Sequence, residues 1–309
     1  MAFEIIEKTL AVMEKSLLGK RQVLEYALTC LLSRGHLLIE DVPGVGKTTL
    51  AKTLSSVIHG QYARVQFTSD LLPADLLGVT IYRQNESEFV FNEGPIFTNV
   101  LLADEINRAN AKTQSALLEA MHDQQISIEG RPRQLPKPFF VVATQNSKDN
   151  YGTFPLPESQ LDRFMMKIHL GYPDKAYELK VIRGDYSKQE TSEEGISLDK
   201  LKQLQDQVAK VHMEEDVLDY LYRVVLITRR HEAFKVGVSP RGAQNLYRAV
   251  CALAMVRGRD FVVPDDIAEL FLPVCGHRVL PRNTSIGVVD DDYLRATFNK
   301  ILRDVPQPI

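Results

Sequence analysis

Residues 42–48 have the types and spacing of a loop that binds phosphate. Gly44 and Gly46 permit the unusual dihedrals and the close backbone approach that inward-pointing amide groups require. Lys47 would neutralise phosphate oxygens as a point charge, and the Thr48 hydroxyl would ligate Mg²⁺. An apolar run before the loop and a helical pattern after it predict a strand, a loop and a helix whose positive end adds to the anion site. This segment predicts the binding of ATP with Mg²⁺.

Two carboxylates follow a second apolar run. Residues 100–103 predict a buried strand, and Asp104 and Glu105 stand at its end. Asp104 would hold the metal directly or through water, and Glu105 would polarise the attacking water as general base. Alone, this pattern is equally consistent with a solvated loop. Together with the phosphate loop upstream, it indicates ATP hydrolysis.

Three further polar residues stand where such a site would use them. Asn146 follows the apolar run 139–144 and could hold the attacking water. Arg163 precedes the last expected strand, where it could stabilise the transferring phosphoryl group of an adjoining subunit. Arg241 stands in the first turn of an expected helix, where the helix dipole prefers anions, and this suggests contact with phosphate. Each residue also has a plainer alternative: Asn146 could cap a strand or turn, Arg163 could form a surface salt bridge, and Arg241 could be an exposed, solvated arginine.

The first part of the chain carries the elements that would position these residues. Apolar runs of strand length alternate with helical patterns, and these runs are 36–39, 64–67, 100–103, 139–144 and 165–170. Such alternation predicts an α/β fold with a parallel five-stranded sheet flanked by helices. Ligands then bind beyond the carboxyl ends of the strands.

Two pairs of short strand patterns predict hairpin insertions into this plan. In the first, residues 79–83 and 88–91 flank a polar turn at 84–87. In the second, residues 125–128 and 133–135 flank Gly130, Arg131 and Pro132. Both hairpins are expected to project from the core.

Beyond residue 171 the strand patterns fade, and residues 188–195 are rich in polar side chains. We therefore expect an α/β nucleotide-binding core over 1–187 and a small all-α domain over 188–309. Its helices are predicted from an apolar stripe at Val217, Leu218, Leu221, Val224 and Val225, from Ser239 and Pro240 as a helix start, and from a second start at Pro264.

The composition of the chain indicates which kinds of partner, cellular location and metal site to expect. The 309 residues include 37 Lys and Arg against 40 Asp and Glu, and the net charge of −3 gives no general attraction to nucleic acid or anionic lipid. No run of about 18 apolar residues is present, and the start MAFEIIEKTL lacks the features of a signal peptide, so a cytoplasmic protein is expected. The three cysteines predict buried free thiols, and the histidines show no metal-ligand spacing.

Taken in order, these motifs resemble those of an AAA+ ATPase. Residues 44–48 resemble its Walker A motif, 101–105 its Walker B motif, Asn146 its sensor 1, Arg163 its arginine finger and Arg241 its sensor 2. Further stretches resemble the MoxR family, and they are EDVPGVGKTTLAK, FTSDLLPADLLG, FNEGPIFTNVLLADEINRA, ATQN, LPESQLDRF and GVSPRG. One departure stands out, because Asp41 occupies the position where the Walker A consensus begins with glycine.

The resemblance implies a helical lid on the α/β core, ATP between them, and a homo-oligomeric ring, usually hexameric, in which Arg163 completes the neighbour's site. Arg108 is expected at the same interface. Catalytic residues would be Lys47, Glu105, Asn146 and Arg163. Nucleotide contacts would be Pro43, Gly44, Val45, Gly46, Lys47, Thr48, Thr49, Asp104 and Arg241. Metal ligands would be Thr48 and Asp104.

The resemblance also implies chaperone-like work on protein partners, including maturation or insertion of metal cofactors, often together with proteins that carry a von Willebrand factor A domain. A chelatase subunit is a close variant of this function. Two alternatives from other classes remain open. One is a nucleotide-dependent scaffold or switch with little turnover, and the other is a DNA-associated motor, which the acidic balance disfavours.

Overall fold

A parallel five-stranded sheet forms the centre of the first part of the chain. The computed structural model describes residues 2–85, 87–146, 153–184, 195–282 and 291–308. The sheet has the order β2-β5-β8-β1-β9. Its strands are β1 (Leu37–Glu40), β2 (Tyr62–Gln66), β5 (Val100–Asp104), β8 (Phe140–Gln145) and β9 (Met166–Ile168). All neighbouring strands pair in parallel, so the predicted fold class is confirmed.

The apolar runs became strands because both faces of this sheet are covered. Successive side chains of a strand point to opposite faces. Leu37 and Ile39 of β1 pack into one hydrophobic cluster, whereas Leu38 between them packs into a second cluster on the other face. Strands β5 and β8 divide their side chains between the two clusters in the same way. Near-continuous apolar strands are the pattern expected of a parallel sheet buried on both sides.

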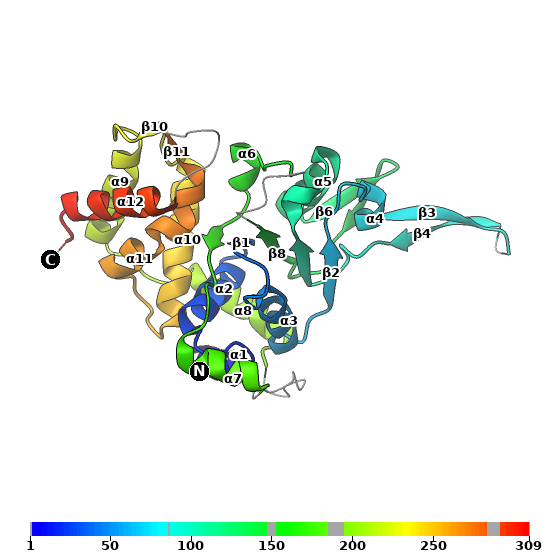
Figure 1. Cartoon of the computed structure of the whole chain (residues 1–309), viewed down its shortest axis with the longest axis horizontal. Helices are drawn as coiled ribbons and strands as arrows, with labels where there is room; N and C mark the ends of the chain where they lie inside the picture. The colour runs from blue at the N-terminus through cyan, green and yellow to red at the C-terminus, as the bar shows by residue number, and fades with distance from the viewer. Residues whose placement is uncertain (1, 86, 147–152, 185–194, 283–290, 309) are drawn as a thin grey trace.

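Helices cover the two faces and connect the strands (Figure 1). Helices α1, α2 and α3 pack into the first cluster, and α4 and α5 pack into the second. The helices of this part are α1 (Ala2–Ser16), α2 (Arg21–Leu32), α3 (Lys47–Val57), α4 (Pro73–Leu77), the 3₁₀ turn η1 (Ile106–Arg108), α5 (Ala111–Asp123), α6 (Glu158–Leu161) and α7 (Lys175–Arg183).

Both predicted hairpins are present. Strands β3 (Gly78–Arg83) and β4 (Glu88–Glu93) form the first, which extends away from the rest of the protein in Figure 1. Strands β6 (Gln125–Ile128) and β7 (Arg131–Gln134) form the second. The guanidinium of Arg133 lies 3.8 Å from the centre of the Phe91 ring, so the two hairpins contact each other.

The predicted turn of the second hairpin was wrong by two residues. Arg131 and Pro132 belong to β7, and Pro132 pairs with Ser127. The turn is made by Glu129 and Gly130, with φ of 52° and 74°. Proline is tolerated there because β7 belongs to a two-stranded sheet, where an edge residue needs no amide donor.

The second part of the chain is predominantly helical, as predicted. It contains α8 (Leu198–Val208), α9 (Glu215–Thr228), α10 (Pro240–Val256), α11 (Pro264–Cys275), the 3₁₀ turn η2 (Gly276–Arg278) and α12 (Asp291–Asp304), with a short antiparallel pair of β10 (Phe234–Val236) and β11 (Leu280–Pro281). The Ser239 hydroxyl caps α10 by accepting from the Gly242 amide, and Pro240 is the first residue of that helix. Of the predicted stripe on α9, Leu218 is 36% exposed and lies outside the core.

The helical part shares its hydrophobic core with one face of the sheet. A single cluster includes Leu37 of β1, Leu28 of α2, Leu253 of α10 and Phe298 of α12. The predicted domain boundary after residue 187 lies outside the described residues and stays a prediction. The three cysteines are buried and free, as predicted. Within the described ranges, no helix is both long and apolar enough to cross a membrane.

Candidate nucleotide site

The loop between β1 and α3 has the backbone that was predicted for it. Gly44 and Gly46 have φ of 85° and 103°, values that side chains with a Cβ rarely adopt. A Cβ at Gly44 would meet no heavy atom within 4 Å, so this position is open to a ligand. Gly46 caps α3 through its backbone, with the Leu50 amide bonded to the Gly46 carbonyl at 2.9 Å. The loop therefore presents its amides and the positive end of α3 to the same space.

Parallel pairing brings the ends of four strands to the same edge of the sheet. Gln66 at the end of β2 pairs with Asp104 at the end of β5, and Glu40 of β1 pairs with Gln145 of β8. A cavity of about 420 Å³ opens at this edge. It is lined by Pro43, Gly44, Gly46, Lys47, Thr48, Thr49, Arg64, Gln66, Asp104, Glu105 and Asn146. The structure thus brings the predicted loop, both carboxylates and Asn146 together.

Lys47 lines this cavity together with the other loop residues and both carboxylates. Its ammonium donates to the Asp41 carbonyl at 2.7 Å. Burial lowers the pKa of Lys47, while the nearby carboxylates of Asp104, Asp41 and Glu105 act in the opposite direction. An ammonium held in a partly desolvated cavity interacts strongly with an anion that enters it, because less water screens the charges.

Asp104 and Glu105 are held by Thr144, Arg64 and Gln66, to which the sequence analysis gave no role, and by Arg108, which was expected at the subunit interface. Asp104 accepts from the Thr144 hydroxyl at 2.6 Å and from Arg64 at 2.7 Å. Glu105 accepts from the Gln66 amide at 2.8 Å and pairs with Arg108 at 3.0 Å.

The backbone also fixes the direction of the Glu105 side chain. Glu105 has φ of 56°, and its amide donates to the Thr144 hydroxyl oxygen at 2.9 Å. A non-glycine residue in this left-handed region is uncommon and persists where its surroundings hold it. The Thr144 hydroxyl therefore orients both carboxylates at once.

Asp41, the departure from the Walker A consensus, has a structural role. One carboxylate oxygen accepts from the Val42 amide at 2.8 Å, and the other accepts from the Gly171 amide at 2.7 Å. Gly171 follows β9 and has φ of 62°. A glycine at position 41 could make neither bond. Asp41 thus ties the start of the phosphate loop to the segment that leaves the sheet.

Three predicted site residues do not line the cavity. The Val45 side chain is buried in the hydrophobic core, so any contact with nucleotide would come from its backbone. Arg163 is half-buried and donates to the Leu118 carbonyl of α5. Arg241 is exposed in the first turn of α10. The roles assigned to these residues stay predictions.

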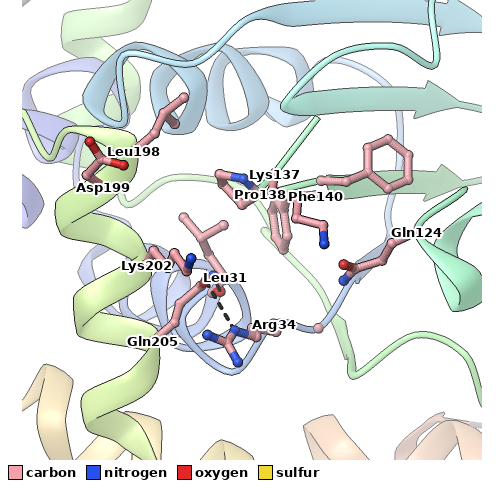
Figure 2. Close-up of a pocket in the computed structure, with 12 residues that line it drawn as sticks. Leu31, Arg34, Gln124, Lys137, Pro138, Phe140, Leu198, Asp199, Lys202 and Gln205 are labelled. Atoms are coloured by element: carbon pink, nitrogen blue, oxygen red, sulfur yellow. Dashed lines mark hydrogen bonds between the residues drawn. The ribbon is translucent and has the colours of Figure 1, made fainter. Parts of the chain in front are cut away.

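A second cavity, of about 330 Å³, lies at the opposite end of the sheet. Figure 2 shows it between α8 and the start of β8, with Arg34 bonded to Gln205. Arg34 also pairs with Asp206 at 2.5 Å, so this arginine is already neutralised. Asp199 is the one carboxylate among the residues that line this cavity, so it lacks the paired carboxylates found at the phosphate loop. The edge that carries Lys47 and Asp104 is the better candidate for chemistry.

Comparisons with known proteins agree with this geometry. A profile described as "ATPase family associated with various cellular activities (AAA)" matches residues 36–166, and one described as "AAA lid domain" matches residues 226–294. The protein "Chaperone MoxR1" of Mycobacterium tuberculosis is 39% identical, over 98% of this chain and 82% of its own length. The chain belongs to the MoxR family of AAA+ ATPases.

Two other relatives support the same family. "Uncharacterized protein YeaC" of Bacillus subtilis is 43% identical over 89% of this chain and 87% of its own length. The crystal structure of a Cytophaga hutchinsonii protein, described as a predicted ATPase, superposes with a TM-score of 0.90 at 35% identity, covering 100% of this chain and 96% of that one.

The predicted site residues are distributed over the two segments that the family profiles match, the ATPase segment at 36–166 and the lid segment at 226–294. Every residue that lines the nucleotide cavity, from Pro43 to Asn146, lies in the matched ATPase segment. Arg163 lies there as well, whereas Arg241 lies in the matched lid segment. The lid is therefore the part of this MoxR-family chain whose position decides whether Arg241 reaches a nucleotide.

Proposed function

We propose that this chain hydrolyses ATP with Mg²⁺ as a ring, usually hexameric, and uses that energy for chaperone-like remodelling or metal-cofactor maturation of partner proteins. The observation that carries the proposal is the cavity in which the loop around Lys47 faces Asp104, Glu105 and Asn146. The family assignment supports it, because the fold is one built for nucleotide chemistry.

The donor set fits the magnesium ion that such a site would use. Thr48 and Asp104 offer a hydroxyl and a carboxylate at the same cavity edge, and Mg²⁺ prefers oxygen ligands. When bound, the ion would neutralise charge on the phosphate oxygens. Arg64 lies 2.7 Å from Asp104 in the structure, so it would have to move from that carboxylate before Asp104 could serve as a ligand.

The chain's own residues would divide the reaction among them. Lys47 would bind and orient the terminal phosphates. Glu105 would take a proton from the attacking water, and Asn146 would hold that water in place. Arg163 of an adjoining subunit would stabilise charge on the transferring phosphoryl group, an effect of about 10³ to 10⁵ in rate where it has been measured.

One observation favours the alternative of a nucleotide-dependent switch with little turnover. Gln66 and Arg108 both contact Oε2 of Glu105, so this oxygen would have to leave these partners before it could serve as general base. The two functions differ in whether nucleotide and a neighbouring subunit release Glu105 from these partners. Turnover measured in the assembled state separates them.

The deciding experiment measures the ATPase rate per subunit against protein concentration. Glu105→Gln is the matched control, since the amide keeps the shape of the side chain but cannot act as general base. The proposal expects a rate that rises with concentration and vanishes in Glu105→Gln, while the variant still binds ATP. Binding without turnover at every concentration would contradict hydrolysis and favour the switch.

The work on protein partners rests on two supports. The Mycobacterium tuberculosis relative is named a chaperone. The β3–β4 hairpin exposes large apolar side chains, with Tyr82 53% and Phe89 75% exposed and their rings 5.1 Å apart. We infer that partners, including proteins with a von Willebrand factor A domain, are contacted there. The test is whether such a protein stimulates the ATPase of the wild type but not that of the Phe89→Ser variant. The predicted cytoplasmic location is a separate proposal, and cell fractionation tests it.

A further inference from the structure

A buried arginine of the helical part reaches into the segment that carries Arg163. Arg278 ends η2, and its side chain is 1% exposed. Its Nε donates to the Asp162 carboxylate at 2.8 Å. Arg278 lies in the matched lid segment and Asp162 in the matched ATPase segment, so this ion pair joins the two.

The same guanidinium also binds the backbone on both sides of Arg163. Its Nη2 donates to the Asp162 carbonyl at 3.1 Å and to the Phe164 carbonyl at 2.6 Å. Its Nη1 donates to the Met165 carbonyl at 3.2 Å and to the Val274 carbonyl. An arginine has five N–H groups in a rigid fork, and each of them finds an acceptor here.

Residues 162–165 have other contacts besides those to Arg278, because the Met165 amide donates to the His36 carbonyl at 2.8 Å and His277 Nε2 lies 3.0 Å from the Phe164 carbonyl oxygen. Arg163 itself donates to the Leu118 carbonyl of α5 and stays half-buried. The short helix α6 before it has no buried residue. The direction in which Arg163 leaves the backbone is therefore set largely by what holds residues 162, 164 and 165.

We propose that Arg278 is a positioning residue, which fixes the backbone around Arg163 so that this side chain meets the nucleotide of the adjoining subunit. The proposal rests on the proposed function, in which Arg163 acts in trans. Because Arg278 belongs to the lid segment, a movement of the lid in one subunit would shift Arg163 toward or away from its neighbour's site.

Stability alone does not account for this arrangement. Removing two charges from water is costly, and a well-packed apolar group is often as stabilising as a buried ion pair. What an apolar side chain cannot do is bind several carbonyls at fixed angles. A fork that binds the carbonyls of 162, 164 and 165 therefore fixes the geometry of this backbone in a way that an apolar side chain could not.

The test mixes two variants that are each inactive alone. Glu105→Gln lacks the general base but still offers Arg163, and Arg163→Ala keeps Glu105 but offers no arginine. In rings formed at random from equal amounts, about a quarter of the interfaces combine an intact base with an intact Arg163. The restored ATPase rate per subunit is the reference. No restoration overturns the shared site, and the positioning role of Arg278 with it.

Arg278→Met is then added to one of the two variant subunits of the mixed ring at a time. In the Glu105→Gln subunit, which donates Arg163, we expect the restored rate to fall at least about tenfold, since a displacement near 1 Å can cost about 10²-fold. In the Arg163→Ala subunit, whose own finger is already absent, we expect less than about a twofold change. A role confined to folding would affect both placements alike.

A milder pair guards against misfolding of Arg278→Met. Asp162→Asn removes the charge opposite Arg278 but leaves the carbonyl contacts, and Arg278→Lys keeps the charge but loses the fork. We expect Asp162→Asn to show the same donor-only loss at smaller size. Each variant is placed either in the Glu105→Gln subunit, which donates Arg163, or in the Arg163→Ala subunit, which receives it. If the restored activity is the same for both placements of both variants, the proposal is overturned while the shared site stays intact.

Discussion

Two arginine–aspartate pairs in this protein have nearly the same length but opposite surroundings. At the nucleotide cavity, Arg64 lies 2.7 Å from Asp104 and is 48% exposed. At the seam between sheet and lid, Arg278 lies 2.8 Å from Asp162 and is 1% exposed. Water and salt screen the first pair, and its net contribution to stability is small. The second pair is desolvated, so the loss of one partner leaves a buried charge without compensation.

The difference indicates two uses for the same pair of residue types. A pair that costs little to break suits a carboxylate that must exchange its partner for a metal ion. A pair that is costly to break suits a backbone segment that must keep its geometry through each cycle. The distance between the charges does not distinguish these uses, whereas burial does.

The largest effect is expected from Lys47→Met at the cavity. Loss of this charge should lower the ATPase rate by at least about 100-fold, because it removes a group aimed at phosphate. The melting temperature without nucleotide should change little, and its rise on adding ATP should disappear. Lys52→Met is the matched control, since Lys52 is exposed on the same helix α3. A retained rate in Lys47→Met would mean that the cavity is not the site of hydrolysis.

The comparison itself is tested by making the same substitution in both pairs. Arg278→Met should lower the free energy of unfolding by about 3 to 5 kcal/mol, since it strands Asp162 and several carbonyls. Arg64→Met should change it by less than about 0.5 kcal/mol. Urea unfolding of the two variants measures both. Equal losses would show that exposure does not separate these pairs.

Asp41→Ala should have an intermediate effect. It removes the acceptor for the Val42 and Gly171 amides, and bonds to a charged group contribute about 1.5 to 3 kcal/mol. We expect lower stability and a higher KM for ATP, because the start of the loop loses its tie to the segment after β9. Asp41→Asn keeps an acceptor oxygen and should lose less. An unchanged KM in Asp41→Ala would show that this tie does not shape the loop.

The smallest expected effect is a pH dependence of the free energy of unfolding, caused by another contact between the sheet and the lid. His169 of the segment after β9 pairs with Asp291 of α12 at 3.3 Å, and Lys167 donates to both Glu40 and Asp291. The hydrogen bond to Asp291 raises the pKa of His169, and the same contact lowers the pKa of Asp291 to about 2.

The sign of this dependence follows from the two directions. Because the folded pKa of His169 is raised, its contribution is complete below the unfolded value and is lost as pH rises through the folded value. The contribution of Asp291 is present above its ordinary pKa and is lost as pH falls toward about 2. Wild type should therefore exceed His169→Gln in stability by more at pH 5.5 than at pH 8.5. A constant difference in urea unfolding would contradict the pairing.

The sequence alone determined most of the fold and the centre of the site. All five strands were predictable because a parallel sheet buried on both faces requires apolar runs. The phosphate loop was predictable because positive φ at Gly44 and Gly46 leaves glycine as the main choice. In both cases the signal lies in neighbours along the chain, whose dihedrals and burial depend on local residue types.

The tertiary structure alone decided which side chains hold the site. Gln66 and Arg64 reach Glu105 and Asp104 only through the register of β2 beside β5. Asp41 meets the Gly171 amide across 130 residues of chain, and Arg278 meets Asp162 across 116. Such contacts depend on how distant segments pack, and their sequence carries no spacing that shows them. The motifs thus follow from local chemistry, whereas their partners follow from the packing of the sheet against the lid.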